Sequence, residues 1–141
     1  MQREIDLVQT SFKEIAKRAD GVSTLFYMRL FELDPSLESL FPSDLTEQRQ
    51  KLVKTLAVAV AGLNDLDRLV PVLEELGCKH VPYGVKPHMY DTVGEAILWT
   101  FETALGPDFT PETKAAWGQI YGIVATTMKN AAYGKTTGRA A

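Results

Sequence analysis

The sequence has few of the residues on which many binding sites and scaffolds depend. Cys78 is the only cysteine in 141 residues, which excludes an intrachain disulfide framework and a paired-cysteine metal site. A single thiol is typical of a reducing cytoplasm. No apolar run is long enough to span a membrane, and residues 1–6 lack the apolar core of a signal peptide. We therefore expect a cytoplasmic protein that does not insert into membranes.

The chain also has no large excess of positive or negative charge. The net charge is −3, from 15 basic and 18 acidic residues that alternate along the chain. This balance argues against a nucleic-acid partner, because such binding depends on neutralising phosphates. Hydrophobic residues make up 45% of the chain, which is typical of a globular protein. The length predicts one domain.

Strand-like alternation is absent, and the apolar residues recur at helical spacing. Turn residues such as Asp20-Gly21, Asp34-Pro35 and Gly106-Pro107 separate the segments. The predicted helices cover residues 3–18, 22–33, 45–63, a stretch ending at 80, 88–105 and 111–132, with a short turn at 37–41. The fold class is all-α, with one domain over 1–133 and a polar tail at 134–141 that we expect to be disordered.

His80 ends a helical stripe of apolar residues, so its ring should point inward. The stripe contains Leu66, Leu69, Val70, Leu73, Leu76 and Gly77. An imidazole in an apolar space indicates an axial ligand of a buried metal cofactor, or a core histidine bonded to a backbone carbonyl. Cys78 beside it could be a thiol ligand or a small apolar filler. The other histidine, His88, lies eight residues away at a helix start, where we expect a surface or capping residue.

The two histidines are not spaced for a zinc pair on one helix. A cofactor that needs a single protein ligand fits better, and haem held by a proximal histidine is the common case. Gln48 lies one turn before Leu52 on an apolar face, so a polar amide points inward there. With Tyr27 on another helix and Phe41 as a wall, these side chains predict a pocket. Catalytic motifs such as HExxH are not found.

Several segments of the chain are distinctive in their order and separations. They are residues 25–31 (LFYMRLF) with Asp34-Pro35, Leu40-Phe41, Glu47-Gln48 with Lys51-Leu52, Lys79-His80 with residues 83–85 (YGV), residues 93–95 (VGE), and Ala116-Trp117 with Tyr121-Gly122. Together they resemble the bacterial single-domain globins, a group that includes the Vitreoscilla-type haemoglobin and the globin domain of flavohaemoglobins. Neuroglobin-like sequences share some of the same segments.

The resemblance implies a globin fold, a three-over-three helical sandwich around haem b, with the D helix absent or very short. It implies that His80 binds the iron. The other cofactor-binding residues it implies are Phe41, Lys51, Leu52, Tyr83, Val85, Tyr90 and Val93. Lys51 would reach a haem propionate, or else stay solvated.

At the distal position this sequence has Gln48 where neuroglobin-like sequences have histidine. An amide ligates iron poorly, so the resemblance implies pentacoordinate Fe(II) with an open sixth position. Tyr27 and Gln48 could each donate a hydrogen bond to bound O2, with CO and NO as competing ligands. The alternatives are a core tyrosine bonded to a carbonyl and a glutamine that swings into solvent.

On the proximal side, the resemblance places Tyr90 near the ring of His80. Flavohaemoglobin-like globins add a glutamate that polarises this histidine. Its expected place falls near Ala131-Ala132, so the carboxylate is missing here. This departure weakens the case for a strongly activating, peroxidase-like site.

The sequence leaves three functions open. The first is reversible O2 binding for storage, delivery or sensing, by a monomer or weak homodimer. The second is nitric oxide dioxygenase activity, for which a separate reductase would be needed because the chain has no Gly-rich dinucleotide fingerprint. The third, a haem-free helical interaction module, is disfavoured by an inward-facing His80.

Overall fold

The computed structural model describes residues 1–134 and shows six α-helices connected by short helical turns. The helices are α1 (Gln2–Ala16), α2 (Ala19–Leu33), α3 (Thr46–Ala61), α4 (Leu66–His80), α5 (Met89–Leu105) and α6 (Pro111–Lys129). The turns are η1 (Pro35–Leu40), η2 (Gly62–Asn64), η3 (Val81–Tyr83), η4 (Gly106–Asp108) and η5 (Asn130–Gly134), the last of them a π-helical turn. Residues 1–134 contain no strand, and residues 41–45 between η1 and α3 contain no helix.

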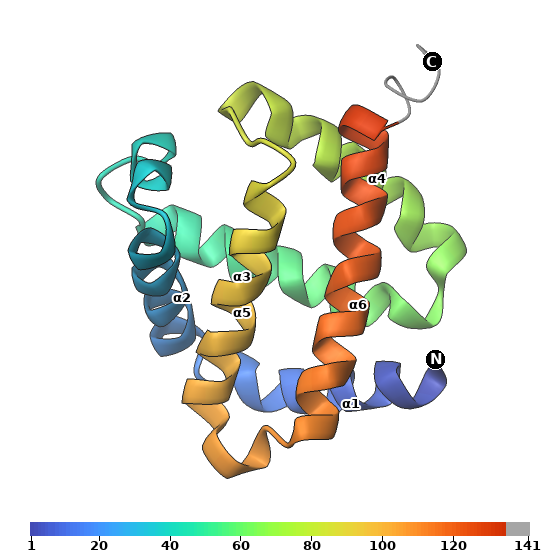
Figure 1. The fold of residues 1–141 in the computed structure, drawn as a ribbon. Helices are drawn as coiled ribbons and strands as arrows, with labels where there is room; N and C mark the ends of the chain where they lie inside the picture. The colour runs from blue at the N-terminus through green and yellow to red at the C-terminus, as the bar shows by residue number, and fades with distance from the viewer. Residues whose placement is uncertain (135–141) are drawn as a thin grey trace.

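The helices form two crossed layers (Figure 1). In that view α2, α5 and α6 run side by side in front, and α1, α3 and α4 cross behind them. Within the front layer α2 packs closely against α5. Between the layers, α1 and α4 each pack against α6. This arrangement is the all-α, three-over-three sandwich that the sequence predicts.

One part of the core lies where α1 packs against α6 and α5. The predicted apolar face of α1 is buried there, with Val8 fully enclosed, while Ala16 is exposed against expectation. Trp117 of α6 packs edge-on against Phe101 of α5, with ring centroids 4.7 Å apart. The Trp117 indole donates to the Ser11 hydroxyl over 2.8 Å, which satisfies its only polar atom. Apolar packing and this hydrogen bond together hold α1 against α6.

The start of α2 differs from the sequence prediction. Asp20 and Gly21 do not separate the first two helices but lie in the first turn of α2, which begins at Ala19. Two hydroxyls, those of Ser23 and Thr24, donate to the Asp20 carbonyl oxygen. An acidic residue in a first turn interacts favourably with the helix dipole, and glycine near a helix end is tolerated. The actual break is Arg18, whose φ of −119° and ψ of 31° are not helical.

The chain turns sharply directly after His80. The helix α4 continues through Pro71 to His80 without a break, and η3 follows at once. Gly84 ends η3 with φ of +86°, a left-handed conformation that favours glycine. The Val85 N–H returns to the His80 carbonyl oxygen over 3.4 Å. The corner predicted at residues 81–84 therefore fixes the direction in which the chain leaves His80.

Two expectations concern the chain ends and membranes. Apart from Gly134, which closes η5, the predicted polar tail lies outside the described residues, so its disorder stays a prediction. Within residues 1–134, none of the helices combines the length and apolar character needed to cross a bilayer.

Candidate functional site

His80 is the last residue of α4, and its ring is half-buried. Its Nδ1 atom lies 2.6 Å from the carbonyl oxygen of Leu76, one turn earlier. A carbonyl only accepts, so Nδ1 carries the hydrogen, and in the neutral imidazole Nε2 then has a free lone pair. Such a bond fixes the tautomer and the orientation of a metal-binding histidine. The backbone bond expected for a core histidine is thus present, and it is also the bond that prepares Nε2 for a metal.

The surroundings of His80 include Tyr90 of α5. The two ring centroids are 6.4 Å apart and the ring planes are tilted by 41°. Tyr90 is buried, yet its hydroxyl has no hydrogen-bond partner among the described residues. Burial raises the pKa of Tyr90 to about 12. Buried polar atoms without a partner are rare, so this hydroxyl indicates that another group belongs beside it.

The expected glutamate is missing near Ala131-Ala132, and these residues lie at the start of η5. Ala131 offers only its carbonyl oxygen, 3.6 Å from the Cys78 thiol. Two residues later Tyr133 donates its hydroxyl to the carbonyl oxygen of Val85, in the loop that follows η3. Sequence reasoning missed Tyr133, although an aromatic residue beside two alanines at a helix end was an available signal.

A second group of site residues surrounds Tyr27 of α2. Tyr27 is only 4% exposed, and its hydroxyl makes a hydrogen-bonding contact with the side-chain amide of Gln48 in the first turn of α3. Burial raises the pKa of Tyr27, and the bond with Gln48 offsets part of that rise. The hydroxyl therefore keeps its proton at neutral pH and can still donate it. Gln48 is half-buried and turned inward, rather than swung into solvent.

Aromatic rings hold Tyr27 in place. Phe41, directly after η1, meets it edge-on with centroids 5.5 Å apart, and Phe26 does the same at 4.9 Å. Phe31 lies 5.7 Å from Phe41. Rings packed from several sides leave the tyrosine little freedom to rotate. The structure thus brings together Tyr27, Gln48 and Phe41, and their role as the wall of a ligand pocket stays a prediction.

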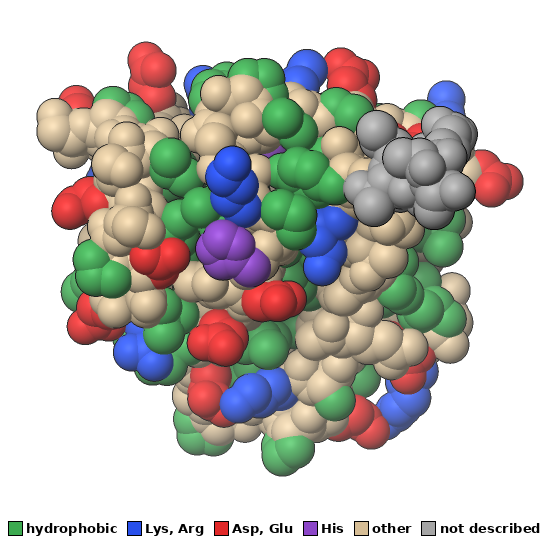
Figure 2. All heavy atoms as spheres, turned by 45° about the horizontal axis from the view of Figure 1, so that its top comes forward, with side chains coloured by type: hydrophobic (Ala, Val, Ile, Leu, Met, Phe, Trp, Pro, Cys, Tyr) green, Lys and Arg blue, Asp and Glu red, His purple; other side chains and the backbone are tan. Residues whose placement is uncertain are grey.

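The remaining predicted cofactor residues differ in burial. Leu52, Val85 and Val93 are half-buried and pack against the core. Lys51 is exposed, and Tyr83 is 69% exposed. Figure 2 shows the end of the molecule to which η3 belongs, where hydrophobic side chains lie at the surface among charged ones. The contacts of Lys51 and Tyr83 with a cofactor stay predictions.

The residues present fit a haem. A flat apolar cofactor needs apolar side chains that are not already buried against one another, and Leu52, Val85 and Val93 meet this condition. An iron needs one nitrogen with a free lone pair, which His80 supplies. The unpartnered Tyr90 hydroxyl lies on the same side as His80.

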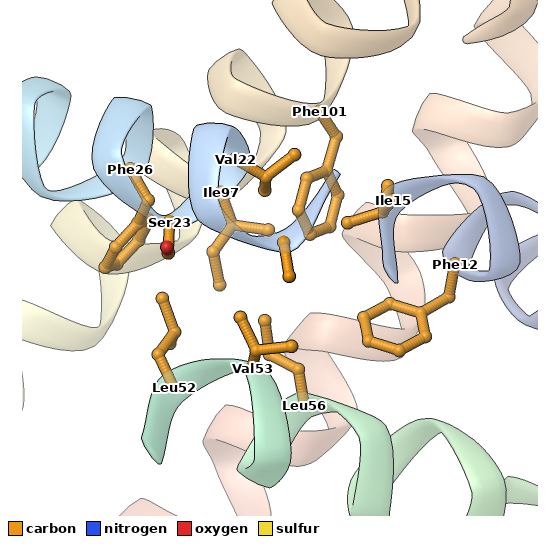
Figure 3. A pocket seen from close by; sticks show the side chains of 11 residues that line it. Phe12, Ile15, Val22, Ser23, Phe26, Leu52, Val53, Leu56, Ile97 and Phe101 are labelled. Atoms are coloured by element: carbon orange, nitrogen blue, oxygen red, sulfur yellow. The ribbon is translucent and has the colours of Figure 1, made fainter. Parts of the chain in front are cut away.

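A small apolar cavity lies behind the Tyr27 group (Figure 3). Leu52, Val53 and Leu56 of α3 point into it from one side, and Phe26, Ile97 and Phe101 from the other. Its volume of about 10 Å³ is close to the minimum that one water molecule needs. The only polar side chain in its wall, Ser23, donates to a backbone carbonyl 3.1 Å away. Nothing in the wall therefore favours a water molecule.

Comparisons with known proteins agree on one family. The family model described as Globin matches residues 24–128. A neuroglobin from Tetraodon nigroviridis is 30% identical over 140 residues, covering 89% of this chain and 88% of that protein. A flavohemoprotein from Rhizobium meliloti is 30% identical over 130 residues, and one from Bacillus subtilis 28% over 128 residues. These alignments cover 90% and 87% of this chain but only 32% of each flavohemoprotein, about a third of its length.

Solved structures share the fold. A bacterial globin from Campylobacter jejuni superposes with a TM-score of 0.84 at 21% identity, covering 97% of this chain and 99% of that one. An engineered carbene transferase, derived from a putative nitric oxide dioxygenase of Rhodothermus marinus, superposes with a TM-score of 0.85 at 23% identity. It covers 100% of this chain and 99% of its own.

Proposed function

Because this chain belongs to the globin family, we propose that it binds O2 reversibly at a haem b held by His80. The family and the flavohemoprotein relatives imply a haem cofactor. The observation that carries the proposal is the bond from His80 Nδ1 to the Leu76 carbonyl, which leaves Nε2 free for iron. When bound, the haem supplies a ferrous iron that takes up O2, CO or NO.

Tyr27 and Gln48 select among these gases. The Tyr27 hydroxyl and the Gln48 amide lie in contact with each other, and each carries a hydrogen that can be donated to a gas ligand. Of these gases, O2 would gain partial negative charge on binding and CO would not, so the Tyr27 proton would favour O2. One hydrogen bond in a water-poor pocket contributes roughly 1–3 kcal/mol, which is about tenfold or more in affinity. We therefore expect tight O2 binding with slow release.

The visible spectrum of the dithionite-reduced, oxygen-free protein tests this proposal. One broad visible band with a Soret peak, converting to an O2 complex on aeration, is the expected result. Two sharp visible bands before aeration would mean that a side chain occupies the sixth position. Purification without haem, even when haem is supplied, would favour a haem-free interaction module instead.

A second candidate function is nitric oxide dioxygenase activity with a separate reductase. Two observations favour it: the match with flavohemoproteins, and a fold neighbour described as a putative nitric oxide dioxygenase. A nitrate product would require that each oxidised haem be reduced again by a donor protein. Consumption of NO that depends on an added flavin reductase would support this function, and stoichiometric consumption unaffected by the reductase would exclude it.

We place this activity in the cytoplasm, which the single cysteine supports. The partners we expect are diatomic gases and, for turnover, an electron donor. Size-exclusion chromatography with light scattering would test whether the chain works as a monomer or a weak homodimer.

A further inference from the structure

The helix that carries His80 meets α6 backbone to backbone at one point. Gly77 lies one turn before His80, is buried, and faces Met128 near the end of α6. A Cβ atom added to Gly77 would lie 2.8 Å from the Met128 Cα and 2.9 Å from its carbonyl carbon, and closer still to the carbonyl oxygen. Carbon atoms normally keep about 3.5–4.0 Å. Only a residue without a side chain fits here.

Other glycines lack this property. Gly118 and Gly122 of α6 have nothing within 4 Å of an added Cβ. An added Cβ on Gly94 of α5 would meet the ring of Tyr121, which is a side chain and not backbone. The obstacle to a side chain at position 77 is backbone, which no change of rotamer removes. A substitution there must separate α4 from α6, by a distance on the order of 1 Å.

Such a separation would carry the imidazole of His80 with it. Residues three apart on a helix are neighbours, turned by roughly 60° about its axis. The His80 ring is tied to its own helix through the Leu76 carbonyl, so it follows any movement of α4. The backbone contact at Gly77 thus controls where Nε2 stands relative to the rest of the pocket.

We propose that Gly77 is a positioning residue for the proximal histidine. By allowing α4 to rest on the α6 backbone, it sets the position of the His80 Nε2 and hence the strength of its bond to the iron. The inference rests on the proposed function, in which His80 binds the haem iron.

The test compares Gly77→Ala with Gly122→Ala in the full-length, haem-loaded chain. The readouts are the iron–imidazole stretching band of the reduced protein by resonance Raman, and the rate of haem loss to excess apomyoglobin. We expect Gly77→Ala to shift the band and to speed haem loss roughly tenfold to a hundredfold, which corresponds to about 1.4–2.8 kcal/mol of lost binding. Gly122→Ala should match the wild type. Equal bands and rates in all three proteins would overturn the proposal.

If Gly77→Ala does not fold, a second variant, Met128→Ala, still tests the proposal. It removes the side chain but leaves the backbone against which Gly77 rests. The melting temperature should fall while the stretching band stays in place. A band that moves in Met128→Ala would show that side-chain bulk positions His80, and would overturn the role of Gly77. A wild-type protein without this band would instead refute the proposed function itself.

Discussion

The two groups of site residues are built by different means. On the His80 side, main-chain atoms make the decisive contacts: the carbonyl of Leu76 holds the ring, and the carbonyl of Val85 receives the Tyr133 hydroxyl. On the Tyr27 side, side chains hold side chains, through Gln48 and Phe41. A main-chain carbonyl remains in place when the side chain of its residue is substituted, whereas a side-chain partner is lost. Under the proposed function, the main-chain contacts would hold the cofactor durably, and single substitutions on the Tyr27 side would alter the selection of gases.

Removing the imidazole should have the largest effect. His80→Gly leaves no nitrogen for the iron, so we expect the purified chain to lose nearly all of its haem, read as the ratio of Soret to protein absorbance. Added imidazole should restore a five-coordinate ferrous spectrum by occupying the vacated space. A His80→Gly chain that keeps the wild-type spectrum without imidazole would show that another residue is the ligand.

On the opposite side, Tyr27→Phe should change the gases without changing the haem content. Losing the proton donor costs roughly 1–3 kcal/mol, so O2 should dissociate roughly tenfold to a hundredfold faster in stopped-flow displacement by CO. CO dissociation should change far less. Thr127→Ala removes a hydroxyl of α6 that bonds only within its own helix, and it serves as the control. Equal rates of O2 dissociation in both variants would show that Tyr27 does not stabilise bound O2.

A smaller effect is expected for Gln48→Leu, because in this structure the amide supports Tyr27. A neutral hydrogen bond contributes about 0.5–1.5 kcal/mol, so O2 release should quicken by roughly threefold to tenfold. In the double variant with Tyr27→Phe, the two effects should not add, since residues in one network are coupled. Additive effects would mean that each side chain reaches the ligand separately.

The His80 side can be probed through pH. The pKa of Tyr90 rises from 10 to about 12 on folding because the side chain is buried. The folded state thus binds this proton more tightly, so the stabilisation is complete below pH 10 and is lost as pH rises towards 12. The slope approaches about 1.4 kcal/mol per pH unit for one group. Denaturant unfolding of Tyr90→Phe across this window should give a shallower fall than the wild type, while identical slopes would exclude Tyr90.

The smallest effect is expected for Lys51→Ala, at an exposed position of α3. Surface ion pairs contribute about 0–1 kcal/mol, so haem loss should quicken by no more than about fivefold. The same variant measured at high salt distinguishes the two interpretations of this lysine. A difference from wild type that shrinks with salt would support contact with a propionate, and no difference at low salt would support a solvated lysine.

The sequence predicts local features of this fold well and contacts between helices poorly. Apolar periodicity locates the helices and the buried face of α1, and the run of turn residues after His80 predicts the corner at 81–84. The start of α2 is missed because Asp20-Gly21 is compatible with both a break and a first helical turn. The position of Leu66 is also missed, since it lies on the predicted inner stripe but at the start of α4, where it is 42% exposed.

Within the site, the sequence predicts the residue types but not which of them contact one another. It predicts Tyr27 and Gln48 as parallel donors, whereas the structure pairs them with each other. The contacts from Tyr133 to Val85 and from Gly77 to Met128 join segments about fifty residues apart in sequence, so they depend on how closely the helices approach. Periodicity reports which side of a helix is buried and contains no information on that distance.

The half-buried apolar residues Leu52, Val85 and Val93 also bear on the life of the protein in a cell. A chain whose hydrophobic wall is completed by a cofactor gains stability in proportion to the logarithm of the cofactor's free concentration. Newly made copies that wait for haem expose this wall to proteases and chaperones, and loaded copies do not. We therefore expect the supply of haem to set how much of this protein accumulates, independently of how strongly it is expressed.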